Sequence, residues 1–594
     1  MKFALVTRAI TFASLCVLAT ACGSGSSGGG AETEPEPDSD PQPLTPVEPQ
    51  SPQQPVEPEQ PVEPEQPVEP EQPESGTISG EASESEPLST GSESLSSLAA
   101  GEVITGTLAQ NQETVIRVPS GAEVILTSDT GDVDLFLITE PVFSVDALVC
   151  SGIVVGREHN CAATVDDGEL YALVFAQEDS TFTLTATTDC SVASVNQWVN
   201  RNMLDYYLFA DLVPVVDPAA FNNPGELIQE LRFNELDPFS NIQVAAVQEE
   251  RTETGGAFGL GFRSMVDSEG NERVTTVYTD SPFGRAGINR GDIIVGIDGV
   301  AVDELDDQVI FELLGDRDNP REAVWEFVRG DTGTTEFIPI TIGEFTVNSV
   351  LFSSTFTNDN FGGTVGYLVF DSFIGTSEQD LDVAIADLRD AGITELVLDL
   401  RYNGGGLISV ANRLASQIAG PSVAGETLVS YEFNDEYTDV NFDFDAVNAS
   451  PSLDLDRVLV LTTGQTASSS ELVINGLQPF IEVVTFGERT LGKPFISASR
   501  PFCGVSLNAM EAQGVNSNGV TVAGGIEADC FAADDVTRDY GSRSGSLEGM
   551  LASSLDFLLN GTCDASPTFA KQPDVREPLF ADELPPPGAL LDRR

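Results

Sequence analysis

The sequence predicts a multidomain chain that combines a β-sandwich, an α+β module and an α/β unit with a mainly parallel sheet. Three observations support this prediction. The chain has 594 residues, whereas a single domain usually has roughly 100–200. Short alternating segments such as "TFTLTAT" fill residues 101–192, as expected for sandwich strands. From about residue 346, apolar runs alternate with helical patterns, which indicates parallel strands joined by crossover helices.

The charge balance limits the kinds of partner that the chain can bind. The sequence holds 95 acidic and 27 basic residues, a formal net charge of -68. Because phosphates would be repelled by such a surface, nucleic acid is not an expected partner. The acidity instead fits a well-solvated surface in a salty medium.

The amino terminus resembles a bacterial lipoprotein signal. Basic residues open the chain, residues 9–21 are mainly apolar, and small residues precede Cys22. By resemblance to a lipobox, residues 1–21 are a lipoprotein signal peptide and Cys22 carries the lipid. Gly23 favours the outer membrane, so we expect the cell envelope of a Gram-negative bacterium, with the chain facing the periplasm or the surface. A cleaved signal without lipid is the alternative. No later apolar run reaches the roughly 18 residues of a spanning helix.

Residues 22–100 are expected to form an acidic, disordered linker. No Lys or Arg occurs between 31 and 100, and "QPVEPE" occurs three times in succession from Gln54 to Glu71. Frequent proline removes backbone donors and favours extended conformations, while the glutamates repel one another. A Pro-rich ligand for a partner domain is the alternative interpretation.

Six cysteines follow the signal and Cys22, and an even number in an exported chain predicts disulfides. They lack metal-type CxxC spacing. Connectivity cannot be derived from the sequence, but Cys150 with Cys161, and Cys503 with Cys530, are the first pairs to test. The remaining cysteines are Cys190 and Cys563.

Within 101–192, "DTGDVDLFL" resembles the pre-peptidase β-domains of secreted bacterial proteases. Asp129, Asp132 and Asp134 could ligate calcium through clustered oxygens, but solvated turn aspartates are the favoured interpretation. We therefore predict no metal and no cofactor. Residues 193–250 follow as a helical segment, in which aromatic and apolar residues at helical spacing predict a packed amphipathic helix.

Residues 251–344 resemble a PDZ domain. Gly259, Leu260, Gly261 and Phe262 match its carboxylate-binding loop, and "AGINRGDIIVGIDG" follows about 25 residues downstream. Glycines let consecutive N–H groups converge on a peptide carboxylate, and the adjoining strand edge can add the peptide as a further strand. The alternative is a PDZ-shaped spacer that binds no peptide.

The search for a catalytic base points to lysine. The stretches "NGGG" and "TASSSE" both fall at strand-to-helix turns, where sites of parallel sheets form. His159, the single histidine, lies far upstream in the β-rich region. A Ser-His-Asp triad is therefore not expected. Lys493 is the lysine of this neighbourhood, and it could accept a serine proton if burial lowers its pKa from about 10.4.

These motifs together resemble the C-terminal processing peptidases, also called tail-specific proteases. That family combines a helical start, a PDZ domain, a "DLR" glycine turn, a "TASxSE" turn and a lysine 25 residues after the nucleophile. The spacing selects Ser468 with Lys493, because Ser469 and Ser470 precede the lysine by 24 and 23 residues. The resemblance covers about 195–565. It implies a crotonase-like, ClpP-related catalytic domain at 345–565, followed by a tail at 566–594.

The resemblance also implies residue roles. Ser468 would be the nucleophile and Lys493 the general base and then acid, with backbone donors at Gly405 and Ser469 in the oxyanion hole. The family's usual lysine-orienting glutamine is replaced by Ser497, so Ser497 or Ser499 would take that task. In the other interpretation, Ser468-x-x-Glu471 is only a helix capping box.

We therefore expect a lipid-anchored serine endopeptidase that cleaves unfolded or carboxyl-terminal segments of envelope proteins. Protein or peptide substrates would be its partners, held through their C-termini, and the lipid alone would attach it to the membrane. The first alternative is a catalytically silent, PDZ-containing, peptide-binding lipoprotein. The second is an adhesin in which the β-rich region matters most.

Overall fold

The computed structural model describes residues 96–143, 147–152, 159–163, 168–357, 363–445, 451–540 and 547–563. The expected signal, the lipid site at Cys22, nearly all of the linker and the tail at 566–594 lie outside these residues. None of the helices within the described ranges is long and apolar enough to cross a membrane.

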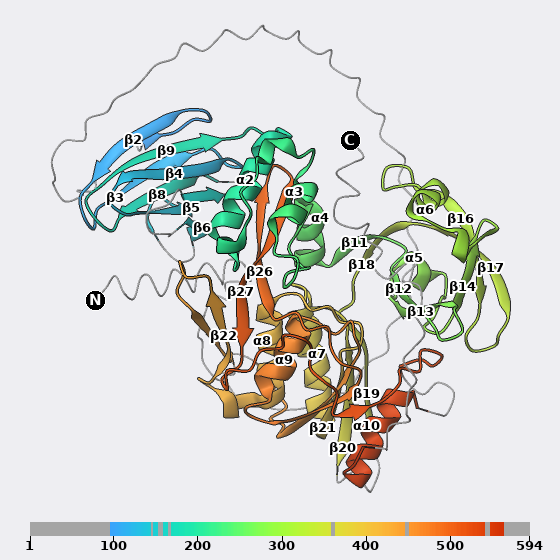
Figure 1. Ribbon diagram of the computed structural model, residues 1–594. Coiled ribbons are helices and arrows are strands. Elements are labelled where there is room, and N and C mark those ends of the chain that lie inside the picture. The colour runs from blue at the N-terminus through green and yellow to red at the C-terminus, as the bar shows by residue number, and fades with distance from the viewer. Residues whose placement is uncertain are drawn as a thin grey trace, which may run out of the picture. The chain divides into compact units, whose positions relative to one another are not determined.

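The amino-terminal β-rich region folds into two sheets around one apolar core (Figure 1). One sheet has the order β1-β3-β8-β5-β6, and the other has the order β2-β9-β4-β7. In β9 every second residue is buried, which is the period-2 pattern on which the prediction depended. The strands are β1 (Ser96–Ser97), β2 (Val103–Leu108), β3 (Glu113–Val118), β4 (Glu123–Thr130), β5 (Val133–Ile138), β6 (Leu148–Gly152), β7 (His159–Ala162), β8 (Leu170–Ala176) and β9 (Ser180–Thr187).

A short helical segment follows and packs on a β-hairpin from the far end of the chain. Its main helix ends at Asp205, earlier than the apolar pattern suggests, because Tyr206 caps it and the chain then turns. Trp198 of this helix and Phe502 of the hairpin lie in one core cluster. The elements are α2 (Val192–Asp205), η2 (Ala210–Leu212), η3 (Pro218–Ala220), α3 (Pro224–Leu231), β10 (Asn241–Val244), α4 (Ala245–Glu249) and η4 (Glu250–Thr254).

The PDZ region forms a separate sheet with the order β12-β13-β14-β16-β17, while β15 pairs with β14 and β11 pairs with β18. β12 is an edge strand, so one side of it has no strand partner in this sheet. The elements are β11 (Gly256–Gly259), β12 (Phe262–Val266), β13 (Glu272–Val277), α5 (Pro282–Arg285), β14 (Ile293–Ile297), β15 (Val300–Ala301), η5 (Val302–Glu304), α6 (Asp307–Leu314), β16 (Glu322–Val328), β17 (Thr335–Thr341) and β18 (Gly343–Thr346).

The last region holds a six-stranded sheet with the order β19-β20-β21-β24-β25-β28. All neighbours pair in parallel except β19 with β20, which confirms the mainly parallel α/β fold. A second sheet, β10-β27-β22-β23 with β26 on β27, contains the hairpin. The strands are β19 (Val350–Thr357), β20 (Thr364–Phe370), β21 (Ile393–Asp399), β22 (Thr427–Phe433), β23 (Val440–Asp443), β24 (Arg457–Thr462), β25 (Glu482–Gly487), β26 (Phe495–Phe502), β27 (Val505–Val515) and β28 (Cys530–Phe531).

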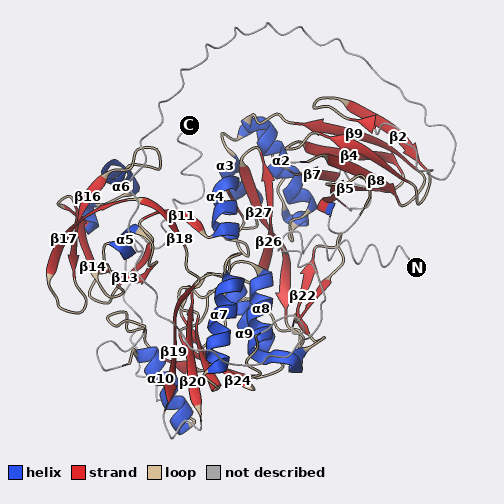
Figure 2. Ribbon diagram, turned by 180° about the vertical axis from the view of Figure 1, so that it is seen from behind, coloured by secondary structure: helices blue, strands red, loops and turns tan. Residues whose placement is uncertain are grey.

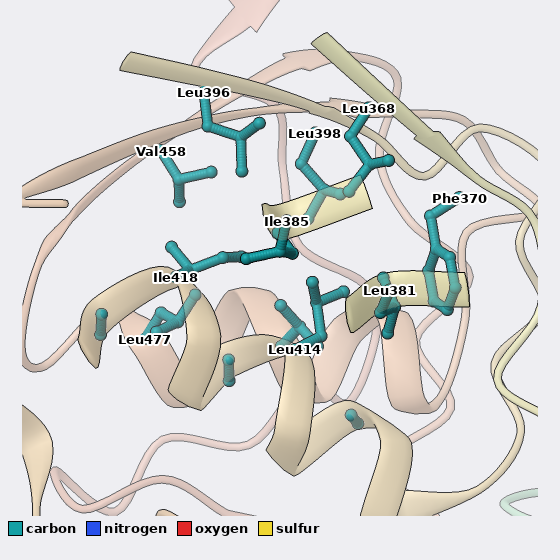
Figure 3. Close-up of a cluster of buried hydrophobic side chains, with 14 of the residues drawn as sticks. Leu368, Phe370, Leu381, Ile385, Leu396, Leu398, Leu414, Ile418, Val458 and Leu477 are labelled. Carbon is teal, nitrogen blue, oxygen red and sulfur yellow. The ribbon is translucent and has the colours of Figure 1, made fainter. Parts of the chain in front are cut away.

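Helices cover both faces of the six-stranded sheet (Figure 2). Those on one face contribute residues such as Leu414 and Ile418, which face Leu398 and Val458 of the strands (Figure 3). On the other face, Met550 and Leu555 pack against the sheet. The helices are α7 (Ser377–Asp390), α8 (Ile408–Ala419), η6 (Gly420–Val423), α9 (Ser469–Leu477) and, on the second face, α10 (Gly549–Asn560).

Disulfides connect parts of the chain that are distant in sequence. Cys150 pairs with Cys161 as expected, but the predicted Cys503–Cys530 pair is wrong. Cys503 lies at the turn between β26 and β27, next to the end of the β-rich region, and bonds Cys190. Cys530 begins β28 in the main sheet and bonds Cys563, just after α10. Cys503 and Cys530 therefore lie in different elements, the hairpin and the edge strand of the main sheet.

Candidate active site

Three turns meet at the carboxyl ends of adjacent parallel strands. The glycine turn follows β21, the serine turn follows β24, and the lysine turn follows β25. Because parallel neighbours end at the same edge of a sheet, segments separated by about 90 residues of sequence are brought together there. This is the edge at which ligands of open parallel sheets bind.

Ser468 occupies a strained position in the serine turn. Its backbone has φ 56° and ψ -115°, a region that residues other than glycine rarely adopt. Ser468 and Glu471 do form the capping box that the sequence suggested, but ordinary helix N-caps have extended dihedral angles and Ser468 does not. Holding a non-glycine residue there costs on the order of 1–3 kcal/mol, and such residues are concentrated at functional sites. Ser468 is also the one partly exposed serine of the three.

The two following serines fasten the serine turn to the glycine turn. The Ser469 hydroxyl donates to the Gly406 carbonyl at 2.7 Å, and the Ser470 hydroxyl donates to the Asn403 carbonyl at 2.9 Å. Both serines are buried. Their side chains are therefore occupied by structural hydrogen bonds, which leaves Ser468 as the candidate nucleophile.

Only glycine fits where the glycine turn touches the serine turn. Gly405 has φ +96°, and a Cβ on it would lie 2.8 Å from both Ser468 Cβ and Ser469 N. A Cβ on Gly406 would lie 2.0 Å from the Phe373 carbonyl oxygen. Contacts this short would displace backbone, so a side chain at 405 would force the glycine and serine turns apart, and one at 406 would displace the backbone of Phe373. The close approach brings backbone N–H groups next to Ser468.

The two predicted oxyanion donors differ in this structure. Ser469 N–H opens α9 and, over the described ranges, makes no hydrogen bond, so it is free for an incoming oxygen. Gly405 N–H donates to Asn403 Oδ1 at 2.9 Å. The Asn403 side chain is itself held, because its Nδ2 donates to the Phe370 carbonyl at 2.9 Å. The Gly405 N–H can therefore donate to an oxyanion only if it releases Asn403 Oδ1 or donates to both oxygens at once.

A buried carboxylate, Glu471, joins the serine turn to the lysine turn. One oxygen accepts the N–H groups of Ser468 at 2.8 Å and Lys493 at 2.9 Å. The other accepts the Gly492 N–H at 2.7 Å and the Thr490 hydroxyl at 2.5 Å. Glu471 has 0% of its surface exposed. From the sequence, Glu471 was expected only as half of a capping box. Its bonds to the lysine turn show that it also joins two turns that are distant in sequence.

Lys493 lies in a setting that favours its neutral form. Burial lowers the pKa of the Lys493 amine below its ordinary value, while the charges of Asp237 and Glu471 oppose that shift. Its Nζ lies 5.5 Å from the centre of the Phe239 ring. Throughout the described part of the chain, Lys493 forms no ion pair within 4.0 Å and no hydrogen bond with Ser468. The two groups are thus brought to one edge without being in contact.

The same regions match known protein families. Residues 364–530 match the model of peptidase family S41, residues 194–241 match the peptidase S41 N-terminal domain, and residues 273–322 match a PDZ domain. Residues 364–530 form a peptidase family S41 domain. The serine, glycine and lysine turns all lie inside the first of these matches.

Relatives of this S41 chain are named as proteases. It is 27% identical over 317 residues to the chloroplastic C-terminal processing peptidase of Tetradesmus obliquus, covering 49% of this chain and 65% of that protein. It is 26% identical over 294 residues to a "Probable CtpA-like serine protease" of Staphylococcus haemolyticus, covering 47% and 53%. The chain thus spans about half to two thirds of the length of these curated relatives. A solved S41-type structure from Bacteroides fragilis aligns at a TM-score of 0.50 with 22% identity, covering 61% of this chain and 97% of that one, and indicates a shared fold.

Two serines expected to orient the lysine of this S41 chain do not contact it. Ser497 lies exposed in β26, and its hydroxyl makes no hydrogen bond within the described residues. The Ser499 and Ser506 hydroxyls lie 2.7 Å apart and bond one another. A bulge between Ile496 and Ser497 shifts the register of β26, which the spacing from the lysine could not reveal.

The PDZ loop has the backbone that its motif requires. β11 ends at Gly259 and β12 begins at Phe262, and Leu260 and Phe262 are buried in the PDZ core. Gly261 has φ +75°, and a Cβ there would lie 2.0 Å from Ser281 Cβ. The Gly261 carbonyl is bound by Tyr278 N–H and the Ser281 hydroxyl, both at 3.0 Å. The loop is therefore fixed beside the edge strand β12.

The remaining candidates of the β-rich region contribute nothing to the site. His159 is buried in β7, and burial lowers the pKa of its imidazole to about 4. Asp134 accepts a hydrogen bond from Gln177 at 2.6 Å, and burial raises its pKa to about 6. The side chain of Asp129 lies outside the described residues. Within them, no group of three His, Cys, Asp or Glu, including Asp132, could hold a metal ion.

Replacing Glu471 by glutamine should weaken the fold around the site. An amide NH₂ cannot accept, so at least one buried N–H of the serine or lysine turn would lose its partner. We expect the free energy of unfolding in urea to fall by about 1–3 kcal/mol. The control is Glu488→Gln, whose exposed side chain makes no hydrogen bond in the described structure and should change stability by less than about 0.5 kcal/mol. Equal stability of the two variants would contradict the role of Glu471.

Proposed function

We propose that this S41 chain is a serine endopeptidase that uses Ser468 and Lys493 as its catalytic dyad. The observation that carries the proposal is the rarity of lysine. The chain has 27 basic residues but only three lysines, Lys2, Lys493 and Lys571, so 24 are arginines. Arginine supplies the cation of buried ion pairs such as Arg401–Asp399 and of exposed ones such as Arg117–Glu169. A guanidinium cannot lose its proton near neutral pH, whereas a buried amine can, so lysine stands where a base is needed.

In this mechanism Lys493 takes the proton of the Ser468 hydroxyl as its oxygen attacks the scissile carbonyl carbon. The resulting oxyanion would be held by Ser469 N–H and, after release from Asn403, by Gly405 N–H. The protonated amine then gives its proton to the leaving nitrogen, and an acyl-enzyme forms at Ser468. Water attacks the ester with Lys493 again acting as base, and the acid product leaves.

A second candidate is a catalytically silent, peptide-binding lipoprotein. It is favoured by the missing contact between Ser468 and Lys493, and by the engagement of Gly405 N–H with Asn403. Catalytic hydrogen bonds are often long before substrate binds, so these features do not decide against the peptidase. The strain at Ser468 has no use in a purely structural protein, which is why we place the peptidase first.

Substitutions at the dyad separate these two candidates. Purified mature protein should cleave an unfolded reporter protein, and Ser468→Ala or Lys493→Arg should slow cleavage by at least about 10³-fold. The arginine keeps the charge but cannot serve as a base. Lys571→Arg is the matched control and should cleave at the parental rate. Cleavage by both dyad variants at the parental rate would refute the dyad, and a parent that cleaves no reporter would favour the silent protein.

We further propose that the PDZ loop presents the carboxyl terminus of the substrate. Its fixed glycine turn beside the edge strand β12 supports strand addition of a peptide whose carboxylate meets the loop. A peptide substrate with a free terminal carboxylate should then have a kcat/KM about 10–100 times that of the same peptide amide, in line with one charge-assisted hydrogen bond. Equal kcat/KM values would indicate a PDZ-shaped spacer instead.

We also propose that the protein is attached through lipid at Cys22 to the envelope of a Gram-negative bacterium, where unfolded or damaged envelope proteins are its substrates. The apolar leader, the small residues before the cysteine and the acidic linker support this location. In a Gram-negative host, Cys22→Ser should move the protein from the detergent phase to the aqueous phase. Cys16→Ser, inside the leader, should leave it in the detergent phase. Parental partitioning of the Cys22 variant would disprove the anchor.

A further inference from the structure

The turn before β10 holds a second buried carboxylate, two residues before the Phe239 ring that lies 5.5 Å from Lys493 Nζ. Asp237 has 0% of its surface exposed, and its Oδ1 accepts the N–H groups of Phe239 at 2.8 Å and Ser240 at 2.9 Å. Its Oδ2 accepts the Tyr207 hydroxyl at 2.8 Å. Three donors from its own region thus fix the carboxylate, and no arginine or lysine pairs with it at salt-bridge distance within the described chain.

This turn wraps around the lysine turn. The Phe239 ring that lies 5.5 Å from Lys493 Nζ also packs against Phe495, two residues after the lysine, with ring centres 6.3 Å apart. Ser240 Oγ accepts the Met510 N–H of β27 at 3.0 Å, which fixes the turn to the hairpin that starts beside Lys493. The Asp237 turn is therefore packed on the hairpin that follows Lys493.

The charged groups that face Lys493 come from two different elements. Glu471 of α9 binds the backbone of the lysine turn, and Asp237 lies on the side of the helical segment. Tyr207 stays neutral, because burial raises the pKa of its hydroxyl well above the ordinary value. Arg232 donates to the carbonyls of Pro238 and Ser240. Burial lowers the pKa of the Lys493 amine, and the charges of Asp237 and Glu471 both oppose that shift.

We propose that Asp237 is the positioning residue for Lys493. Asp237 is held by Tyr207 and by its own turn. Its charge stabilises the ammonium that forms when Lys493 takes the serine proton, and it thereby favours one position of the flexible amine. The inference rests on the proposed dyad for its catalytic consequence, but its electrostatic part concerns Lys493 alone. Asp237 touches neither the substrate nor the reacting atoms.

The test measures the titration of Lys493 directly. The full chain is acetylated with trace acetic anhydride between pH 6 and 11, and the modified fraction of each lysine peptide is measured by mass spectrometry. Lys571 serves as an internal reference lysine. In Asp237→Asn and Asp237→Ser, the side-chain oxygen can still accept the N–H groups of the turn but not also the Tyr207 hydroxyl, and the Lys493 pKa should fall by about one unit relative to the parent. Asp237→Glu should restore most of the loss.

The matched control is Asp211→Asn, an exposed carboxylate elsewhere in the helical segment, which should leave the titration of Lys493 unchanged. Activity gives a second measurement. The neutral amine is the active form, so a lower pKa moves the rising limb of kcat/KM to lower pH, while the weaker hold on the ammonium lowers the plateau about tenfold. A folded Asp237→Asn protein whose Lys493 titrates like the parent would overturn the inference.

The outcomes distinguish the inference from the proposed function. If the labelling pKa falls as expected but the parent cleaves no substrate, Asp237 controls Lys493 and the peptidase proposal fails. If the parent is a peptidase and Asp237→Asn loses rate without any change in pKa or in the rising limb, Asp237 is only structural and the inference fails.

Discussion

The arrangement of the site depends on one buried carboxylate. Glu471 accepts the backbone N–H of the candidate nucleophile and the backbone N–H of the candidate base through a single oxygen, so it fixes the distance between two turns that follow different strands. A carboxylate is suited to this task because it can accept several donors and donates none. Without it, the peptide groups of both turns would be buried unpaired, and the strained backbone of Ser468 would be free to relax.

Around this carboxylate the chain adds supports from distant regions. Arg263 of the PDZ edge strand donates to the carbonyl of Tyr402, immediately before the glycine turn, at 2.5 Å. Arg201 of α2 forms a bidentate pair with the buried Glu123 of the β-rich region. The Cys190–Cys503 disulfide fastens the same region to the hairpin tip. The β-rich region thus helps to hold the hairpin that follows Lys493.

Much of this could be predicted from local patterns. Apolar alternation and the strand-to-helix turns predicted the parallel sheet, and the resemblance to the C-terminal processing peptidases, with its 25-residue interval, pointed to Ser468 and Lys493. Patterns of this kind depend on the period of apolar residues and on the spacing of motifs, and both can be counted directly in the sequence. The structural hydrogen bonds of the Ser469 and Ser470 hydroxyls could not be predicted, because their partners, Gly406 and Asn403, lie more than 60 residues upstream.

What the sequence could not reveal depends on contacts between distant segments. The hairpin β26–β27 packs against helices some 300 residues earlier, which determined the disulfides and turned Ser497 outward. The same packing brought Asp237 to Lys493. The most direct measurement of the central claim is covalent capture by a serine-directed fluorophosphonate, with the adduct located by fragmentation mass spectrometry. We expect an adduct on Ser468 that disappears in Lys493→Arg. An adduct on Ser469 or Ser470, or none on the folded parent, would contradict it.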